Sequence, residues 1–111
     1  MAISSTRLST TSSTSVYTSV GTNAVTTIVA CNTGVPNLTD ETINAANLTL
    51  HLVASGFPAS DTNTIVKNLT IPAGETVFFS DEKVILSNGD SIVAQASAAP
   101  LISITVSVLA V

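Results

Sequence analysis

Charged residues are scarce in this chain: they make up 9% of its 111 residues, and only three of them are cations. Three cations cannot neutralise a run of phosphates, so binding of nucleic acid through a basic face is excluded. One cysteine and one histidine are also too few for a zinc site or a disulfide framework within one chain. We therefore expect no metal, no cofactor and no nucleic-acid partner.

Hydroxyl groups supply the polarity that charges lack. The chain contains 15 serines and 17 threonines, whereas aromatic residues make up 4% and tryptophan is absent. Removing a hydroxyl from water costs less than removing a charge, provided that the hydroxyl finds a hydrogen bond. A charge-poor surface therefore favours permanent contact with another protein over life as a free monomer, where charge sustains solubility.

Length and hydropathy indicate one domain outside the membrane. A chain of 111 residues is of single-domain size. The uncharged stretch Ser91–Val111 is broken by Gln95 and Pro100, and Leu101–Val111 is only about half as long as a spanning helix needs. Residues 1–15 contain a single cation and no apolar run, so we expect no secretion signal and no membrane partner.

The first fifteen residues are rich in serine and threonine and have no helical periodicity. Such a composition is typical of a disordered tail, which becomes ordered only when something packs against it. We predict that residues 1–15 form an extended arm held by a neighbouring subunit, and that residues 16–111 form a β-sandwich domain.

The rest of the chain has the pattern of short strands separated by turn residues. Alternating apolar and polar residues and β-branched runs mark eight segments. They are Val16–Val20, Ala24–Asn32, Asn47–Ala54, Thr64–Ile71, Thr76–Ser80, Lys83–Leu86, Ser91–Ala96 and Leu101–Val111. This spacing predicts an all-β fold: an antiparallel β-sandwich or jelly roll of about eight strands, with a small closed barrel as the alternative.

Turn residues predict the connections between these strands. Pro72-Ala73-Gly74 predicts a tight turn, because proline sets φ at the first corner and glycine frees the exit. Asn88-Gly89 between two apolar runs predicts a β-hairpin with positive φ at both residues. The longest loop is Thr33–Ala45, in which we expect a short helical turn around Asp40–Ala45, capped by Thr39 or Asp40.

Few residues are candidates for catalysis. His51 lies on the polar side of a predicted strand, and a general base would need a nucleophile and an orienting carboxylate beside it. No serine has the glycine setting of a nucleophile elbow. The acid pairs Asp40-Glu41 and Asp81-Glu82 lack the spacing of a calcium loop, and Cys31 has no cationic neighbour in sequence. We expect His51 at the surface or at an interface, and no catalytic residue.

The four aromatic residues offer little to a sugar, which exposed aromatic faces usually hold. Phe78 and Phe79 are adjacent in one predicted strand and therefore point to opposite faces, so at most one of them lies in the core. Phe57, next to Pro58 in a loop, is the best exposed anchor, and we interpret it as a contact for another protein.

Several groups of residues follow one another in a familiar order. They are Arg7-Leu8, Ser15-Val16-Tyr17-Thr18-Ser19-Val20, Leu48-Thr49-Leu50-His51-Leu52-Val53, Leu69-Thr70-Ile71-Pro72-Ala73-Gly74-Glu75-Thr76, Val84-Ile85-Leu86 with Gly89-Asp90-Ser91-Ile92, and Leu101-Ile102-Ser103-Ile104-Thr105-Val106-Ser107. In order and spacing this pattern resembles the small structural proteins of tailed bacteriophages. The resemblance covers the chain from Arg7 to Val108 and rests on no single motif.

The resemblance implies a β-sandwich virion component without enzymatic residues. Such proteins decorate or cement the capsid, or act as adaptor or fibre-attachment proteins of the neck and tail. We therefore expect a homo-oligomer in the virion, assembled in the bacterial host cytoplasm, with the major capsid protein among its partners. The candidate contacts to subunits or partners are Arg7, Leu8, Tyr17 and Phe57. The alternative from another class is a module that binds host glycans, which a concave polar groove with Phe57 or Tyr17 exposed would favour.

Overall fold

The computed structural model of the chain describes residues 2–79 and 84–111. In these ranges the chain forms nine strands and no helix, which confirms the all-β prediction. The strands are β1 (Ala2–Arg7), β2 (Thr14–Thr18), β3 (Asn23–Asn32), β4 (Ala46–Val53), β5 (Thr64–Ile71), β6 (Thr76–Phe79), β7 (Val84–Leu86), β8 (Ser91–Ala96) and β9 (Ile102–Ala110). None of the described residues forms a helix that could cross a membrane.

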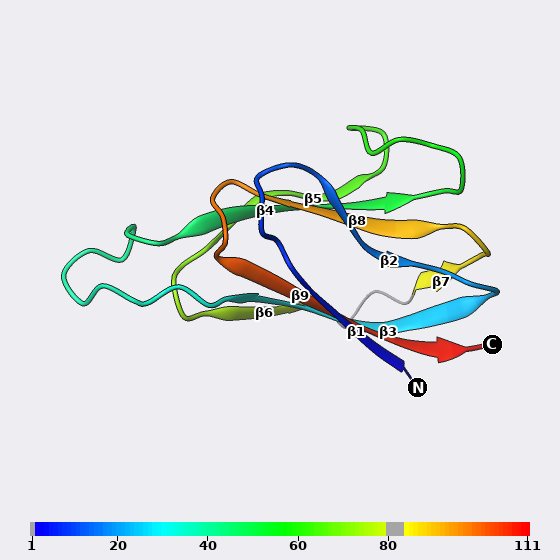
Figure 1. Cartoon of the computed structure of the whole chain (residues 1–111), viewed down its shortest axis with the longest axis horizontal. Helices are drawn as coiled ribbons and strands as arrows, with labels where there is room; N and C mark the ends of the chain where they lie inside the picture. The colour runs from blue at the N-terminus through cyan, green and yellow to red at the C-terminus, as the bar shows by residue number, and fades with distance from the viewer. Residues whose placement is uncertain (1, 80–83) are drawn as a thin grey trace.

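The strands form two antiparallel sheets that face each other (Figure 1). Sheet A has the order β1-β9-β3-β6, and β7 pairs with the part of β3 that β6 leaves free. Sheet B has the order β2-β8-β4-β5. The pairings are nested in the sequence: β1 pairs with β9, β2 with β8, β3 with β6 and β7, and β4 with β5. The chain therefore crosses repeatedly from one sheet to the other.

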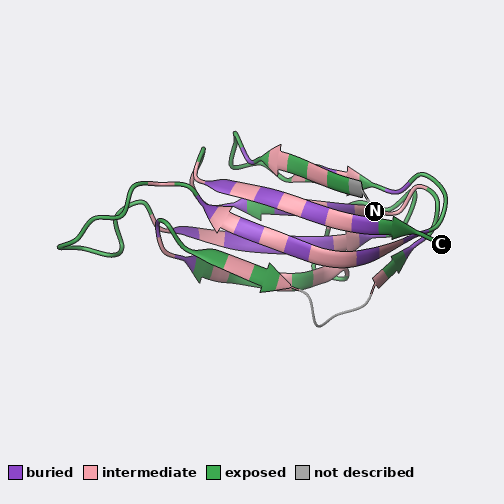
Figure 2. Ribbon diagram, turned by 90° about the horizontal axis from the view of Figure 1, so that it is seen from below, coloured by how far each residue is buried: buried purple, intermediate pink, exposed green. Residues whose placement is uncertain are grey.

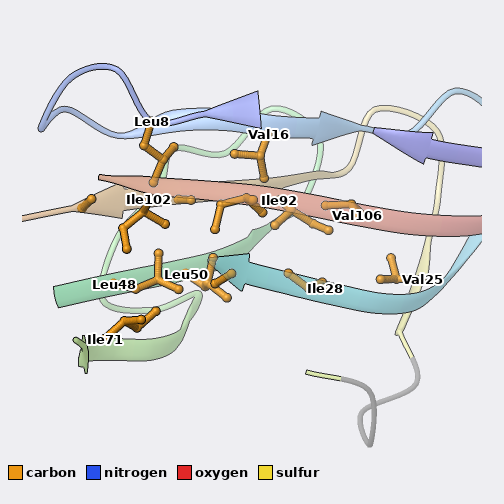
Figure 3. Packing of buried hydrophobic residues seen from close by; sticks show 14 of the residues in the cluster. Leu8, Val16, Val25, Ile28, Leu48, Leu50, Ile71, Ile92, Ile102 and Val106 are labelled. Atoms are coloured by element: carbon orange, nitrogen blue, oxygen red, sulfur yellow. The ribbon is translucent and has the colours of Figure 1, made fainter. Parts of the chain in front are cut away.

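The hydrophobic core fills the space between the two sheets. Along β9 every second residue from Ile102 to Val108 is buried and the residues between them are half-buried, as Figure 2 shows by its alternating colours. Figure 3 shows Leu48 and Leu50 of sheet B in the same interior as Ile102 of sheet A. Burying one such side chain completely stabilises the fold by about 1.5–3 kcal/mol. The two sheets thus enclose one apolar core, as the alternation of apolar and polar residues along the strands predicts.

The N-terminal segment is part of the domain, which corrects the prediction of a separate arm over residues 1–15. β1 pairs with β9 of the same chain without interruption, from Ala2 opposite Val108 to Arg7 opposite Ser103. Leu8 follows the strand, is 0% exposed and donates its main-chain N–H to Ile102 O at 2.9 Å. The sequence offers two local features that agree with this strand, the β-branched residues Ile3 and Thr6 and the apolar Leu8 that follows them, and the average composition of residues 1–15 obscured both.

The turn around Asn88-Gly89 joins two sheets and is not a hairpin, which corrects the second local prediction. β7 before it belongs to sheet A, whereas β8 after it belongs to sheet B. Asp90 N donates to Ser87 O at 3.0 Å, and Gly89 has a φ of 89° while Asn88 is not among the residues with positive φ. One left-handed residue suffices here because the turn does not have to match the twist of a two-stranded ribbon.

The Pro72–Gly74 turn is confirmed. Glu75 N donates to Pro72 O at 3.1 Å, and Gly74 has the positive φ of 79° that favours glycine.

The bounds of β5 and β8 are those predicted. β2 begins two residues before the predicted strand Val16–Val20. The predicted ends at Ser80 and Lys83 lie outside the described residues, as does Asp81-Glu82.

The long loop 33–45 forms isolated turns in place of the predicted helical turn. Ile43 N donates to Asp40 O, and the Asp40 carboxylate accepts hydrogen bonds from Thr42 Oγ1 at 2.6 Å and Thr42 N at 3.0 Å. These bonds, led by the one from the hydroxyl, hold the pKa of Asp40 below its usual value. Asp40 therefore caps a turn, as predicted, although no helix follows.

Asn32 attaches this loop to the sheets. Its side chain is completely buried; Nδ2 donates to Asn44 O at 2.8 Å and to Ile71 O at 2.9 Å, and Oδ1 accepts from Gly34 N at 2.8 Å. A buried amide with every main-chain partner satisfied fixes the relative positions of the segments that it connects. Asn32 thus joins the end of β3 to loop 33–45 and to β5.

Candidate functional site

A polar groove lies on the outer face of sheet B. It has a volume of about 440 Å³. It is lined by Asn47, Thr49 and His51 of β4, Lys67 and Asn68 of β5, Gln95 and Ala96 of β8, and by Ser13, Ala59, Ser60, Asp61 and Ser97 from loops. We call it the His51 groove. Apart from one lysine and one aspartate, its polar lining consists of hydroxyls, amides and the imidazole.

A bulge in β5 helps to form the His51 groove. Leu48 pairs with Leu69, and Leu50 pairs with Val66, so that two residues of β5 lie opposite the single residue Thr49. These two residues are Lys67 and Asn68, and Asn68 has a left-handed φ of 51°. A bulge bends its strand and redirects side chains. Here both bulge residues line the groove, which a regular strand with alternating side chains would not allow.

His51 is buried at the floor of the groove, with 6% of its surface exposed. Its Nδ1 lies 3.1 Å from each of three oxygens: Ser60 O, Asn63 Oδ1 and Thr64 Oγ1. The loop between β4 and β5, green in Figure 1, supplies these oxygens together with the first residue of β5. Of the two expected positions for His51, an exposed surface is wrong, because this loop folds back over β4, and an interface stays a prediction.

The polar contacts of the groove lie around His51 and along the groove wall. The hydrogen-bond partners of His51 within the described residues include neither a serine hydroxyl nor a carboxylate. Lys67 Nζ and Asp61 Oδ1 form an ion pair at 3.3 Å on the groove wall, with both side chains largely exposed. Among the described residues no cluster of three histidines, cysteines or acids could hold a metal ion.

The four candidate contact residues do not come together. Leu8 is a core residue of its own chain, which contradicts its assignment as a contact. Tyr17 packs against the edge of the core, and the Arg7 guanidinium donates to Pro100 O at 3.0 Å from an exposed position. Phe57 is 68% exposed on the loop over sheet B and lines a separate hollow with Leu52.

The outer face of sheet A is the second candidate surface, and sequence reasoning missed its composition. Residues that pair across the neighbouring strands β1, β9, β3 and β6 form rows on this face. One row consists of Ser5, Thr105, Val29 and Phe78, and the next consists of Arg7, Ser103, Cys31 and Thr76. Further rows contain Ile3 with Ser107, and Leu109 with Ala24 and Ile85. Arg7 is the single charged residue in the five described strands of this sheet. The composition of this face follows only from knowing which strands pair, because alternation shows which residues of a strand share a face but not which strands lie beside it.

Large apolar side chains are exposed on the outer face of sheet A. Phe78 is 66% exposed, Ile85 65% and Ile3 72%. Ile3 lies on β1 next to β9, whereas Phe78 and Ile85 lie on β6 and β7 at the other edge, beyond β3. The molecule therefore has a concave, polar surface on sheet B and a charge-poor surface with apolar margins on sheet A. No protein-family model, no curated protein and no solved structure matches the chain.

Proposed function

We propose that the chain is a non-enzymatic structural protein of a bacteriophage particle, which assembles through the outer face of sheet A. The observation that carries this proposal is the composition of that face: hydroxyls at its centre, apolar side chains around them and one charge, Arg7. Burying hydroxyls costs less than burying charges, and exposed aromatic and aliphatic residues provide the hydrophobic gain.

The distribution of charge supports a second copy as one partner. The chain has a formal net charge of −4, which opposes random self-association. The described acids lie outside the strands of sheet A, at Asp40, Glu41, Asp61, Glu75 and Asp90. Two copies that meet through sheet A therefore bring no acids of these strands together. The proposed state is a homo-oligomer, in which β1 contributes Ile3, Ser5 and Arg7 to the contact face.

The fold within this proposal is a jelly roll. Its support is the nested pairing, in which the first strand pairs with the last and each later strand pairs further inward. Taking β6 and β7 as one interrupted strand along β3 gives eight strands in two sheets of four. Jelly rolls recur in viral capsid proteins, which agrees with a role in a particle, although the fold alone does not specify a function.

The proposed location is the virion, assembled in the bacterial host cytoplasm, where the chain decorates or cements the capsid. Its partners are then further copies and other virion proteins such as the major capsid protein. The alternative is an adaptor or fibre-attachment protein of the neck or tail. Immunogold labelling of purified particles separates these roles: label over the head supports decoration, label confined to the neck or tail supports the alternative, and unlabelled particles overturn both.

Analytical ultracentrifugation of the full chain tests assembly. We expect the wild type to associate with increasing concentration. Thr105→Lys places a charge among the central hydroxyls of sheet A and should weaken this association at least about tenfold, since a buried unpaired charge costs several kcal/mol. The matched control is Thr18→Lys in β2 of sheet B, which should associate like the wild type. A monomeric wild type, or equal effects of both substitutions, contradicts the proposal.

A further inference from the structure

The hydrogen bonds of His51 determine which ring nitrogen carries the proton in the neutral form. Ser60 O can only accept, and Thr64 Oγ1 already donates its hydrogen to Ser60 O at 2.8 Å. The Asn63 amide is oriented because its Nδ2 donates to Pro58 O at 2.9 Å. Nδ1 of His51 thus faces three acceptors, so it carries the hydrogen, and Nε2 is left with a free lone pair.

That lone pair opens into the His51 groove. Within the described residues no group hydrogen-bonds to Nε2, since all three bonds of the ring are made by Nδ1. No buried side-chain nitrogen or oxygen of the described chain lacks a partner, so Nε2 is not sealed off. His51 is otherwise more than nine-tenths buried and lines the groove. A buried ring with one accessible acceptor is a preorganised point of attachment for a ligand donor.

Donors lie along the same groove. Asn47 Oδ1 accepts from Thr70 Oγ1 at 2.9 Å, which leaves the Asn47 NH2 group for a ligand. Ser97 Oγ accepts from Asn47 N at 2.8 Å, so its own hydrogen remains to be donated. Gln95 donates to Thr11 O at 3.0 Å and accepts from Ser13 Oγ at 3.4 Å, which holds Ser13 in the groove wall. His51 and Asn47 are four residues apart along β4, about 13 Å at the rise of a strand, so the acceptor and the donors match an extended ligand whose groups both donate and accept, as hydroxyl groups do.

Charge and composition narrow the ligand class. Lys67 is paired with Asp61, so the groove offers no free cation from its described lining to a phosphate or carboxylate. Its lining has no aromatic or large aliphatic residue, which disfavours an apolar ligand. Its volume of about 440 Å³ falls within the range of about 300–1,000 Å³ that is typical of small-molecule sites.

We propose that the His51 groove binds a neutral saccharide, whose hydroxyl donates to His51 Nε2 and whose oxygens accept from Asn47 and Ser97. The groove lies on sheet B, so this proposal does not depend on assembly through sheet A. Phe57 is not part of the groove lining, so the saccharide is held by hydrogen bonds without ring stacking. We expect weak affinity, with a dissociation constant on the order of 1 mM.

Nuclear magnetic resonance of the full chain tests the site directly, because the single histidine gives unambiguous imidazole signals. The probes are the neutral trisaccharides maltotriose, cellotriose and N,N′,N″-triacetylchitotriose, with inorganic phosphate as the ionic comparison. At least one trisaccharide should shift the Nε2 resonance saturably up to 20 mM, and phosphate should not. The absence of a saturable shift with every trisaccharide, or an equal response to phosphate, overturns the proposal.

Two variants locate the binding. His51→Phe removes the acceptor, and Asn47→Ala removes one donor while keeping the His51 network; each should weaken binding at least about fivefold, measured on amide resonances of the groove. The control is Asn37→Ala, in the exposed loop 33–45 outside the groove, which should bind like the wild type. Unchanged affinity in Asn47→Ala, in a chain with a native amide spectrum, places the ligand elsewhere and overturns the assignment.

Discussion

Replacing Leu8 by alanine tests whether the N-terminal strand belongs to its own domain. Leu8 is completely buried in the core with Val16 and Ile102, and Figure 3 shows its side chain directed into the space between the sheets. Leucine-to-alanine changes in cores cost about 2–5 kcal/mol, depending on how far the cavity collapses. The loop between β1 and β2 can relax around Leu8, so we expect a loss of about 3 kcal/mol.

Urea unfolding monitored by circular dichroism measures this loss. With a denaturant slope of about 1.5 kcal/mol/M, the midpoint should fall by about 2 M. Thermal unfolding should fall by about 12 °C, since 1 kcal/mol corresponds to about 4 °C in a domain of this size. The matched control is Leu38→Ala in loop 33–45, where the same substitution removes a completely exposed side chain and should change the stability by no more than about 0.5 kcal/mol. Equal losses in both variants would refute the placement of Leu8 in the core.

Concentration dependence separates a strand paired within its chain from one exchanged between subunits. The experiment is repeated in the Thr105→Lys background, where assembly through sheet A is disfavoured. An intramolecular β1, as the pairing with β9 indicates, gives a midpoint that is independent of protein concentration. Exchange would couple folding to association, and the midpoint would rise with concentration. A rising midpoint would refute the intramolecular arrangement and restore the arm held by a neighbour.

Two further predictions concern polar contacts of the long loop. Asn32→Ala removes three hydrogen bonds between a completely buried side chain and the main chain and should cost about 3 kcal/mol in urea unfolding. Asn37→Ala removes three hydrogen bonds in an exposed loop and should cost less than about 1 kcal/mol, so equal losses would contradict the role of burial. Thr42→Val removes the hydroxyl that contributes most to lowering the pKa of Asp40, so that pKa should rise in an NMR titration. The pKa of Asp40 is lower in the folded chain than in the unfolded one, so its hydrogen bonds with Thr42 stabilise the fold fully at pH values above the unfolded-state pKa. This stabilisation is lost as the pH falls through the folded-state pKa. An unchanged pKa of Asp40 in Thr42→Val would contradict this account.

Local sequence patterns were sufficient to predict those features of the fold that depend on residues close together in the sequence. The predicted strand Thr64–Ile71 has the observed bounds because the Pro72–Gly74 turn ends it. Along β9 the buried residues likewise coincide with the alternating apolar positions from Ile102 to Val108, as expected for a strand with one buried face. In both cases the information lies within about ten residues, which is the range over which side-chain periodicity and turn chemistry act.

The predictions that were wrong concern features that depend on contacts between residues far apart in the sequence. Residues 2–7 form a strand because β9, about a hundred positions later, supplies its partner. Asn88-Gly89 has the sequence of a hairpin, but its flanking strands find better partners in different sheets. His51 is buried by a loop whose composition indicates only that it is a loop. Which strands pair, and which residues a loop buries, depend on the whole fold and do not follow from the pattern of a single sequence.

The two candidate surfaces follow from one difference between the outward residues of the sheets. β9 presents the short side chains of Ser103, Thr105 and Ser107 outward at the middle of sheet A. β4 presents Asn47, Thr49 and His51, and the bulge and loop beside them create a hollow. Because each surface is the outer side of its sheet, the core separates them and they face in opposite directions. Contact through sheet A would thus leave the His51 groove directed away from the partner, and both proposed functions could operate in the same particle.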